Sequence, residues 1–316
     1  MEYFCPLHDT KLVFHQNGKI SCGLAECKCN FYTQNFGDKM IPVLVDEKCM
    51  DTVFCSEFVT PNRVMESDTR PIVKGIKERY HKLRSMLENK SIRPYMATAK
   101  SALDDLAKAS NASLRCLIVG SGNRSLPTAF DEFDLDVVGF DLFLGKNVDF
   151  VADAHYMPLT KDSFDMIFIQ AVLEHVVEPQ LVADECARVL KPGGIVLSEA
   201  PFLQGIHEDQ YDFFRFTPSA HSLLFKDLTL LEMGVLSGSF ASFVWATRGL
   251  LAKLVGRTSA KIVSAPLFIL ASAFGSSQKQ ADWDNCNSSY VLARKPLEPS
   301  SGSEWFHKKA VSFYLK

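Results

Sequence analysis

Short apolar runs alternate with helix-length segments along the middle of the chain. The runs occupy residues 116–119, 137–140 and 164–170, while residues 125–133 and 178–190 have the length and apolar spacing of helices. A continuous apolar run of this length is typical of a strand that is buried on both faces of a parallel sheet. The alternation predicts an α/β fold with a doubly wound, mostly parallel sheet.

Further segments extend the same pattern on the C-terminal side. Strands are expected at residues 148–153, 194–200, 228–235 and 289–294, and a helix is expected over 217–225. Lysine, proline and two glycines stand between the helix that ends near residue 190 and the next strand, and such residues stop helices. Together with the three runs above, these segments predict a sheet of seven strands.

Residues 62–110 differ in character from the segment that follows them. Between Arg63 and Lys100 there are ten Lys or Arg and four Asp or Glu. Helical apolar spacing over 72–87, and a proline after which a second helix can start, predict two helices. Two interpretations stay open: a helical linker that covers an active-site edge, or a basic face for an anionic substrate. The second helix is expected to have one apolar face, which is formed by Ala102, Leu103, Leu106 and Ala107.

Composition narrows the class of protein. The chain has 316 residues, 47% of them hydrophobic and 22% charged, as in ordinary folded domains. A formal net charge of −3 argues against a dedicated nucleic-acid binder. Nine cysteines, an odd number, favour metal ligands and buried thiols in a reducing compartment, and the start of the chain lacks a signal-peptide pattern. We therefore expect a cytoplasmic protein.

The stretch between the first two strands carries the strongest local signal. Gly120, Ser121 and Gly122 follow the first strand directly, and Asp141 ends the second strand 19 residues after Gly122. A glycine turn followed by an acid about 20 residues on is the pattern that binds a nucleotide ribose. Ser125 stands where a dinucleotide site would have its third glycine. A nucleotide-type ligand and a tight turn without ligand both remain open at this point.

Six blocks of residues follow one another along residues 114–202. The blocks are Val119-Gly-Ser-Gly, Gly139-Phe-Asp141, Asp153-Ala-His-Tyr-Met-Pro-Leu, Ser163-Phe-Asp-Met-Ile, Leu173-Glu-His-Val and Arg188-Val-Leu-Lys-Pro-Gly-Gly. Together they resemble class I S-adenosylmethionine-dependent methyltransferases of the small-molecule "type 11" group. The resemblance implies a Rossmann-like fold over 111–296 whose last, antiparallel strand is inserted at the sheet edge.

The resemblance also implies roles for single residues. Gly120 and Gly122 would let the backbone pass the methionine part of S-adenosylmethionine. Asp141 would accept hydrogen bonds from the two ribose hydroxyls, Asp153 would bind the adenine amino group, and the Ala154 amide would meet the ring. In the first block, Asn123-Arg-Ser replaces the usual glycine-bearing continuation. The implied cofactor-binding set is Gly120, Ser121, Gly122, Asp141, Leu142, Asp153, Ala154 and Gln170.

The acceptor side is expected after the fourth and fifth strands. Gln170 would line the methionine end of the cofactor or the substrate mouth, whereas Glu174 and His175 are more often structural in this family. Residues 201–218 form a mixed aromatic and polar wall that is similar to segments of methyltransferases linked to glycan and envelope biosynthesis. His207 in this wall is the predicted general base, because its ordinary pKa is near neutral. A loop histidine that only packs is the alternative, since alignment can supply most of the rate of methyl transfer.

Residues 1–48 form a small unit with metal-ligand spacing. Cys5 and His8 are followed about 14 residues later by Cys22 and Cys27, and Cys29 is the alternative fourth ligand. A unit of this size has too little core to fold without such a site. It resembles zinc ribbons at the head of some methyltransferases and of a small partner protein of tRNA methyltransferases. A histidine at position 8 and the wider second pair depart from that pattern, so a metal-free ribbon remains an alternative.

Residues 240–280 are predicted to be a helical cap insertion, followed by a polar tail over 297–316. The basic residues of the insertion are five, four and four residues apart with leucines between them, which favours a lid over the acceptor pocket or a peripheral contact with a membrane surface. No uninterrupted apolar window reaches the length of about 18 residues that a membrane span needs. The basic residues are Arg248, Lys253, Arg257 and Lys261.

Taken together, the sequence predicts an S-adenosylmethionine-dependent methyltransferase that acts on a small-molecule or glycan acceptor, at oxygen, with a structural zinc in its N-terminal module. One alternative is a ribosomal or transfer RNA base methyltransferase, because some of these also begin with a zinc ribbon. Another is a binding module that has lost the cofactor. The negative net charge disfavours the RNA alternative.

Overall fold

A computed structural model gives the architecture of the chain. The helix predicted over 72–87 and the tail beyond residue 298 lie outside the part of the chain that it describes. It describes residues 2–5, 8–24, 26–29, 31–45, 93–110, 112–123, 125–207, 211–256, 259–260, 263–267 and 280–298.

All strands of the described residues form one sheet, in the order β1-β2-β3-β4-β7-β6-β5-β8-β9-β11-β10. Its central strands β7, β6, β5, β8 and β9 are parallel, as the alternating pattern predicts. β11 is antiparallel, but it lies between β9 and β10 rather than at the edge. The bounds are β5 Leu114–Val119, β6 Leu135–Asp141, β7 Phe150–Val151, β8 Phe164–Gln170, β9 Leu190–Pro201, β10 Thr229–Ser237 and β11 Ser288–Arg294.

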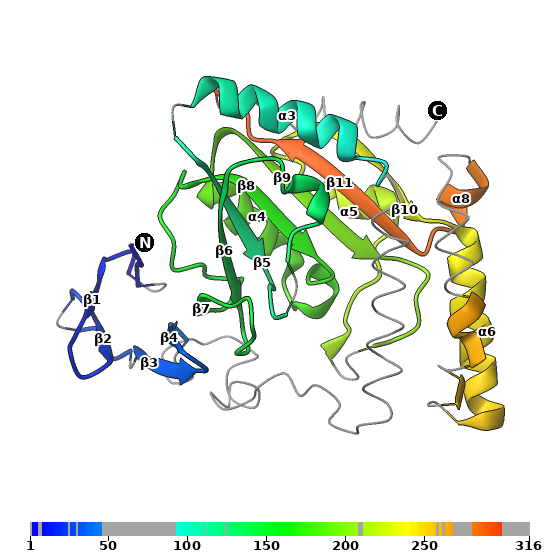
Figure 1. Cartoon of the computed structure of the whole chain (residues 1–316), viewed down its shortest axis with the longest axis horizontal. Coiled ribbons are helices and arrows are strands. Elements are labelled where there is room, and N and C mark those ends of the chain that lie inside the picture. The colour runs from blue at the N-terminus through cyan, green and yellow to red at the C-terminus, as the bar shows by residue number, and fades with distance from the viewer. Residues whose placement is uncertain are drawn as a thin grey trace.

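The N-terminal module continues this sheet instead of forming a separate unit (Figure 1). β4 pairs with β7 in parallel at Val43 and Val151, and the Leu44 amide donates to the Val151 carbonyl at 2.8 Å. The sheet therefore has 11 strands, and the prediction of seven is wrong. Apolar burial explains the join, because Ile41 and Val43 pack with Leu144 and Val151 in one buried cluster. The module's strands are β1 Leu12–Phe14, β2 Lys19–Cys22, β3 Phe31–Phe36 and β4 Lys39–Val43.

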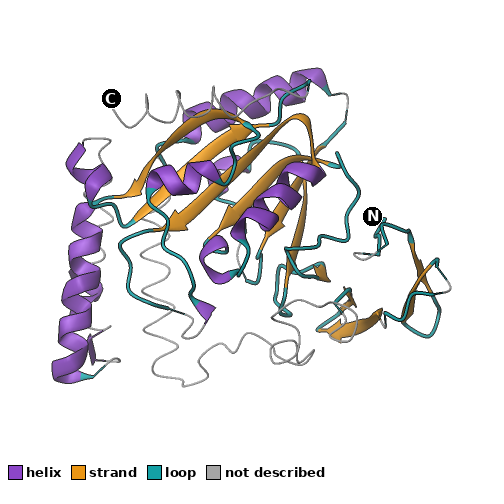
Figure 2. Ribbon diagram, turned by 180° about the vertical axis from the view of Figure 1, so that it is seen from behind, coloured by secondary structure: helices purple, strands orange, loops and turns teal. Residues whose placement is uncertain are grey.

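Helices cover both faces of the central sheet (Figures 1 and 2). Alternate residues of β5 point to opposite faces of the sheet. Cys116 packs in the same apolar cluster as α3, and Leu117 packs in the same apolar cluster as α4 (Pro179–Val189). α3 (Met96–Ala109) is the helix predicted after Pro94. It buries Ala102 and Leu103 as expected, whereas Leu106 is half-buried and Ala107 is exposed, so the prediction for Ala107 is wrong. The remaining helices of this domain are α4 (Pro179–Val189) and α5 (Pro218–Leu223).

The connection between β5 and β6 is not the helix predicted over 125–133. Among its described residues it holds one turn of 3-10 helix, η1 (Thr128–Phe130). Pro127 has extended backbone angles, φ −53° and ψ 135°, and a proline also disfavours helical geometry at the residue before it. Phe130 nevertheless anchors the connection, because its ring is buried in the α3 face of the core.

The insertion after β10 is helical in its described part. α6 (Ser239–Val255) stands at one end of the sheet, and α8 (Gln280–Asp284) returns the chain to β11 (Figure 1). Asp282 ties the two helices together by accepting hydrogen bonds from the backbone and hydroxyl of Ser239. Within the described residues, no helix combines the length and apolarity that crossing a membrane requires.

Candidate functional site

The glycine turn at the carboxyl end of β5 has the backbone geometry that the sequence predicts for it. Gly120 and Gly122 have φ of +66° and +47°, a region that side chains disfavour. A Cβ atom on Gly120 would lie 2.3 Å from Cγ2 of Val172, in the loop after β8. The turn therefore admits no side chain at Gly120. Ser121 donates its amide to the Phe140 carbonyl at 2.9 Å, which holds the turn against β6.

Asn123, the departure in the first block, has a structural explanation. Its side-chain oxygen accepts the Lys146 amide at 3.0 Å, and the Gly122 carbonyl accepts the Asn147 amide at 3.0 Å. A Cβ on Gly145 would lie 2.4 Å from the Gly122 oxygen, so the loop after β6 packs directly on the turn. The atypical residue thus fixes the turn in place of a further glycine.

Asp141 and Asp153 stand at the carboxyl ends of the adjacent strands β6 and β7, where ligands bind in open α/β sheets. The Asp141 side chain accepts the Phe143 amide at 3.2 Å, and its carbonyl accepts the Ala152 amide at 3.1 Å. Leu142 follows Asp141 directly, and Ala154 follows Asp153. The structure therefore brings the two predicted carboxylates to one edge of the sheet.

Asp153 is buried, and only one of its two carboxylate oxygens has a hydrogen-bond partner among the described residues. Its Oδ1 accepts the His155 amide at 2.9 Å and faces His155 Nδ1 at 2.6 Å. The Glu178 amide donates to His155 Nε2, so the ring carries its proton on Nδ1 and donates it to Asp153. Asp153 Oδ2 has no hydrogen-bond partner among the described residues, although the residue is only 2% exposed. A buried oxygen of this kind calls for a donor, which an exocyclic amino group would supply.

Gln170 is held by a buried network that sequence reasoning missed. It ends β8 and donates to Glu199 of β9, a residue that is 3% exposed. The other Glu199 oxygen accepts from Arg93 and from the Tyr95 hydroxyl. Burial and the Glu199 charge raise the pKa of Tyr95 well above its ordinary value, so the hydroxyl remains a donor. A glutamate inside an otherwise apolar strand was the signal that could have revealed the network.

The acceptor side brings His207 to the residues that follow β8. Glu174 and His175 lie in η2 (Leu173–His175), and Glu174 is fully buried. Its Oε1 lies 3.6 Å from His175 Nε2 and 3.7 Å from His207 Nε2, which are ion-pair distances. The facing Glu174 carboxylate is the main reason why the pKa of His207 is raised, against the opposing effect of burial. Because Val172 touches Gly120, this cluster flanks the glycine turn.

The four predicted ligands of the N-terminal module meet in space. Their donor atoms all lie within 4.8 Å of one another, and Cys5 Sγ is 3.4 Å from His8 Nδ1. Cys22 Sγ is 3.8 Å from the same nitrogen, and the sulfurs of Cys5 and Cys27 are 3.9 Å apart. A tetrahedral zinc site places such ligand atoms about 3.4–3.8 Å apart. The arrangement fits zinc, and Cys29 is not among the four residues whose ligand atoms converge.

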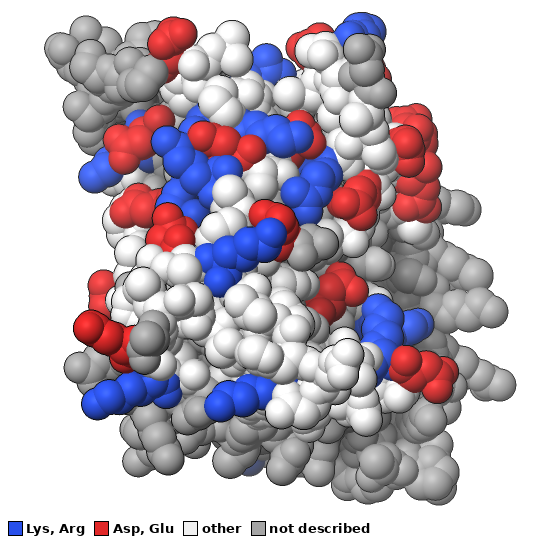
Figure 3. All heavy atoms as spheres, turned by 90° about the vertical axis from the view of Figure 1, so that its left-hand side faces the viewer, with Lys and Arg blue, Asp and Glu red and all other residues white. Residues whose placement is uncertain are grey.

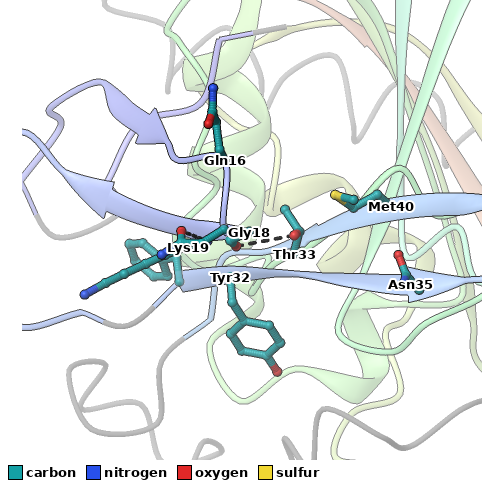
Figure 4. Close-up of a pocket in the computed structure, with 9 residues that line it drawn as sticks. Gln16, Gly18, Lys19, Tyr32, Thr33, Asn35 and Met40 are labelled. Atoms are coloured by element: carbon teal, nitrogen blue, oxygen red, sulfur yellow. Dashed lines mark hydrogen bonds between the residues drawn. The ribbon is translucent and has the colours of Figure 1, made fainter.

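The module also carries an open hollow on β2 and β3 (Figure 4). Thr33 donates its hydroxyl to the Gly18 carbonyl at 3.3 Å at its floor. None of the residues that line it belongs to the strand ends described above, so it is separate from the predicted cofactor site. The lining residues include Gln16, Gly18, Lys19, Tyr32, Thr33, Asn35 and Met40.

Comparison with known proteins agrees with this geometry. Residues 117–198 match the protein family described as "Methyltransferase domain". The chain is 42% identical over 97 residues to a demethylmenaquinone methyltransferase of Clavibacter sepedonicus, covering 30% of this chain and 39% of that protein. A demethylmenaquinone methyltransferase of Paenarthrobacter aurescens (strain TC1) is 38% identical over 94 residues, covering 26% and 36%. The matched segment thus spans less than two fifths of these relatives.

Solved structures with a similar arrangement include a methyltransferase-like protein from Bacillus halodurans. That structure is 20% identical to this chain, with a TM-score of 0.40, and the match covers 62% of this chain and 99% of the other. A TM-score at this level is too low to carry an inference about function. The family match over 117–198 and the local geometry carry it instead.

Proposed function

We propose that the protein is an S-adenosylmethionine-dependent methyltransferase. The observation that carries the proposal is the buried Asp153, one oxygen of which is fixed by His155 while the other has no partner among the described residues. It lies beside Asp141 and the glycine turn, inside the segment 117–198 that matches the methyltransferase domain family. An adenosine-bearing cofactor supplies the missing donors, because its adenine amino group and ribose hydroxyls all donate hydrogen bonds.

Each predicted residue has a distinct task in this proposal. Asp141 accepts hydrogen bonds from the ribose hydroxyls, and Asp153 accepts one from the adenine amino group. The Ala154 backbone amide contacts the adenine ring. Gly120 and Gly122 have no side chains, so the methionine part of the cofactor can lie directly against the backbone of the turn. When bound, the cofactor supplies an activated methyl group on a sulfonium sulfur. Ser121, Leu142 and Gln170 complete the wall of the site.

Calorimetry with S-adenosylhomocysteine tests cofactor binding directly. We expect the whole chain to bind it, and Asp153→Ala to weaken binding about 10- to 100-fold, the value of one or two charge-assisted hydrogen bonds. Asp131→Ala is the matched control, because Asp131 is an exposed acid next to η1. It should keep the wild-type affinity. Absence of binding by the wild-type chain ends the enzyme proposal and leaves the binding-module alternative.

We propose that the acceptor is a small molecule or glycan that is methylated at oxygen. The curated relatives are named demethylmenaquinone methyltransferases, which supports a small-molecule acceptor for the shared segment. His207 assists removal of the acceptor's proton, since Glu174 beside its Nε2 stabilises positive charge there. His207→Ala should lower methyl transfer to hydroxyl-bearing sugars without changing affinity for S-adenosylhomocysteine. Unchanged turnover would remove His207 from the mechanism.

The RNA alternative makes a different prediction. Figure 3 shows Lys and Arg intermixed with Asp and Glu on the face that carries the N-terminal module, without a continuous basic surface among the described residues. This distribution favours a small acceptor over a phosphate backbone. A gel shift with structured RNA separates the two, because a true RNA substrate would bind with an affinity that falls steeply as salt rises.

We also propose that Cys5, His8, Cys22 and Cys27 hold a structural zinc ion. Two of the observed ligand separations, 3.4 and 3.8 Å, match the edges of a tetrahedral zinc site. Buried residues of the module, such as Ile20 and Phe31, share a cluster with the central sheet and do not form a separate core, so the ion would contribute to the folding of the module. Metal analysis of the purified protein tests the proposal, and a zinc content near zero after expression with ample zinc would refute it.

A further inference from the structure

Three possible metal-ligand atoms come together at the acceptor side of the site. They are Glu174 Oε1 and the Nε2 atoms of His175 and His207, and all three lie within 4.8 Å of one another. Glu174 is fully buried, and neither of its carboxylate oxygens has a hydrogen-bond partner among the described residues. A buried carboxylate is stabilised by a facing positive charge, which a protonated imidazole or a metal ion at this position can supply.

The Nδ1 contacts of the two imidazoles differ. His175 Nδ1 lies 2.7 Å from the Tyr211 carbonyl oxygen, which can only accept, so Nδ1 donates and Nε2 keeps its lone pair. His207 Nδ1 lies 3.4 Å from the Gly205 carbonyl and 3.5 Å from the Asp212 carboxylate, which accept, and 3.4 Å from Arg215 Nη2, which can only donate. Either ring tautomer of His207 thus has a partner at Nδ1, and the tautomer that donates from Nδ1 directs a lone pair from Nε2 at Glu174.

Among the described residues, Arg215 supplies a positive charge near His207, with its Nη2 3.4 Å from His207 Nδ1. It does not satisfy Glu174, because both of its terminal nitrogens donate to Asp212. Protonation of both imidazoles would place two positive charges on rings whose centroids are 4.9 Å apart. A single protonated imidazole gives the buried carboxylate one facing charge, whereas a divalent ion coordinates both Nε2 lone pairs and one carboxylate oxygen at once.

We infer that Glu174, His175 and His207 bind a divalent transition-metal ion, such as Zn²⁺ or Fe²⁺, beside the cofactor site. Two imidazoles and one carboxylate form a ligand set that such ions prefer, and a site of three protein ligands keeps a position open for substrate. The Tyr211 carbonyl orients His175, as a hydrogen-bonded partner commonly orients a metal-bound imidazole. The observed 3.6 and 3.7 Å separations exceed the ideal tetrahedral edge by only about 0.3 Å.

The open position faces the side where the histidines are exposed. Their side chains are 19% and 30% accessible, whereas Glu174 is buried behind them. An acceptor hydroxyl bound there would lose its proton more readily, because a metal ion lowers the pKa of a bound hydroxyl group. His207 then assists proton removal as a metal ligand rather than as a free base. This inference rests on the proposed function for its chemical role, but not for the presence of the ion.

Metal content tests the inference in the whole chain. After loading with Zn²⁺ and dialysis, His175→Ala and His207→Ala should each hold one equivalent less than the wild type, while His15→Ala should match it. His15 is an exposed histidine of the N-terminal module that bonds Ser21, so it controls for loss of an imidazole. Glu174→Gln, which keeps the shape of the buried side chain, should also lose the equivalent. Circular dichroism confirms that each variant is folded.

Co²⁺ identifies the ligands, because an ion held by imidazole and carboxylate lacks the thiolate charge-transfer absorption of the cysteine site. We expect the d–d absorption without charge transfer to vanish in His175→Ala and to persist in His15→Ala. Equal metal content and equal Co²⁺ spectra in the wild type and the folded variants would overturn the inference and leave an ion pair at Glu174. Binding of S-adenosylhomocysteine is measured separately, so failure of the methyltransferase proposal is distinguishable from failure of the metal site.

Discussion

His221 offers a quantitative test of how the fold treats a buried titratable group. The residue lies in α5 and is 0% exposed. Its Nε2 is 2.7 Å from the Ser198 hydroxyl on β9, and its Nδ1 is 3.0 Å from the Ser289 hydroxyl on β11. Burial lowers the pKa of the imidazole to about 3, so the ring is neutral in the folded protein at every ordinary pH.

The sign of the resulting pH dependence follows from proton counting. Below pH 6.5, the ordinary pKa of histidine, the unfolded chain binds a proton at His221, whereas the folded chain does not. The free energy of unfolding therefore falls as the pH falls from about 6.5 towards 3. Between pH 7.5 and pH 5 the loss amounts to about 2 kcal/mol. Since pH 5 lies well above the folded-state pKa, this magnitude hardly depends on the pKa value itself.

Urea unfolding of the wild type and His221→Gln at pH 7.5 and pH 5 measures this contribution. Glutamine does not titrate, so the variant should lose about 2 kcal/mol less than the wild type between the two pH values. The substitution also lowers stability at both pH values, but that effect cancels in the comparison. An equal loss in both proteins would show that the ring is protonated in the folded state and would refute the reasoning.

Three further outcomes follow from the structure. Gly120→Ala should abolish binding of S-adenosylhomocysteine in calorimetry, because the new methyl group would lie 2.3 Å from Val172 at a φ of +66°; wild-type affinity would contradict this. Glu199→Gln should lower the free energy of unfolding in urea by about 3–5 kcal/mol, since it leaves Arg93 without its buried partner; a loss near zero would count against that network. Dialysis against a chelator should lower the melting temperature and expose β1–β4 to protease, and an unchanged melting curve would argue against structural zinc.

The central sheet was predictable because buried parallel strands leave a strong trace in sequence. β8 begins and ends at the predicted residues 164 and 170, since an apolar run flanked by polar residues marks both ends. The connection over 125–133 was mispredicted because its apolar spacing outweighed Pro127, whose effect on the backbone is local. The N-terminal module joins the sheet where Val43 pairs with Val151, and no sequence period encodes such a contact.

Candidate site residues could be predicted where the backbone conformation requires a particular residue type. They could not be predicted where side chains from distant parts of the sequence come into contact. Glycines at a turn and acidic residues at strand ends can be recognised in the amino-acid sequence. The convergence of Glu174 with His207 cannot, because 32 positions separate residues that tertiary structure brings within 3.7 Å. The same holds for Glu199, whose partner Arg93 precedes the whole domain.

If the N-terminal module holds zinc as proposed, the continuity of the sheet would connect its metal ligands to the proposed cofactor site by thermodynamic linkage. The module contacts both sides of the segment that carries Asp153, through Val43 with Val151 and through the Phe4 amide, which donates to the Pro158 carbonyl at 3.0 Å. An ion that orders the module would therefore also order this segment before the cofactor arrives. Because such coupling is reciprocal, cofactor would tighten zinc binding by the same factor by which zinc tightens cofactor binding. The module would then act as an allosteric partner of the catalytic domain, built into the same sheet.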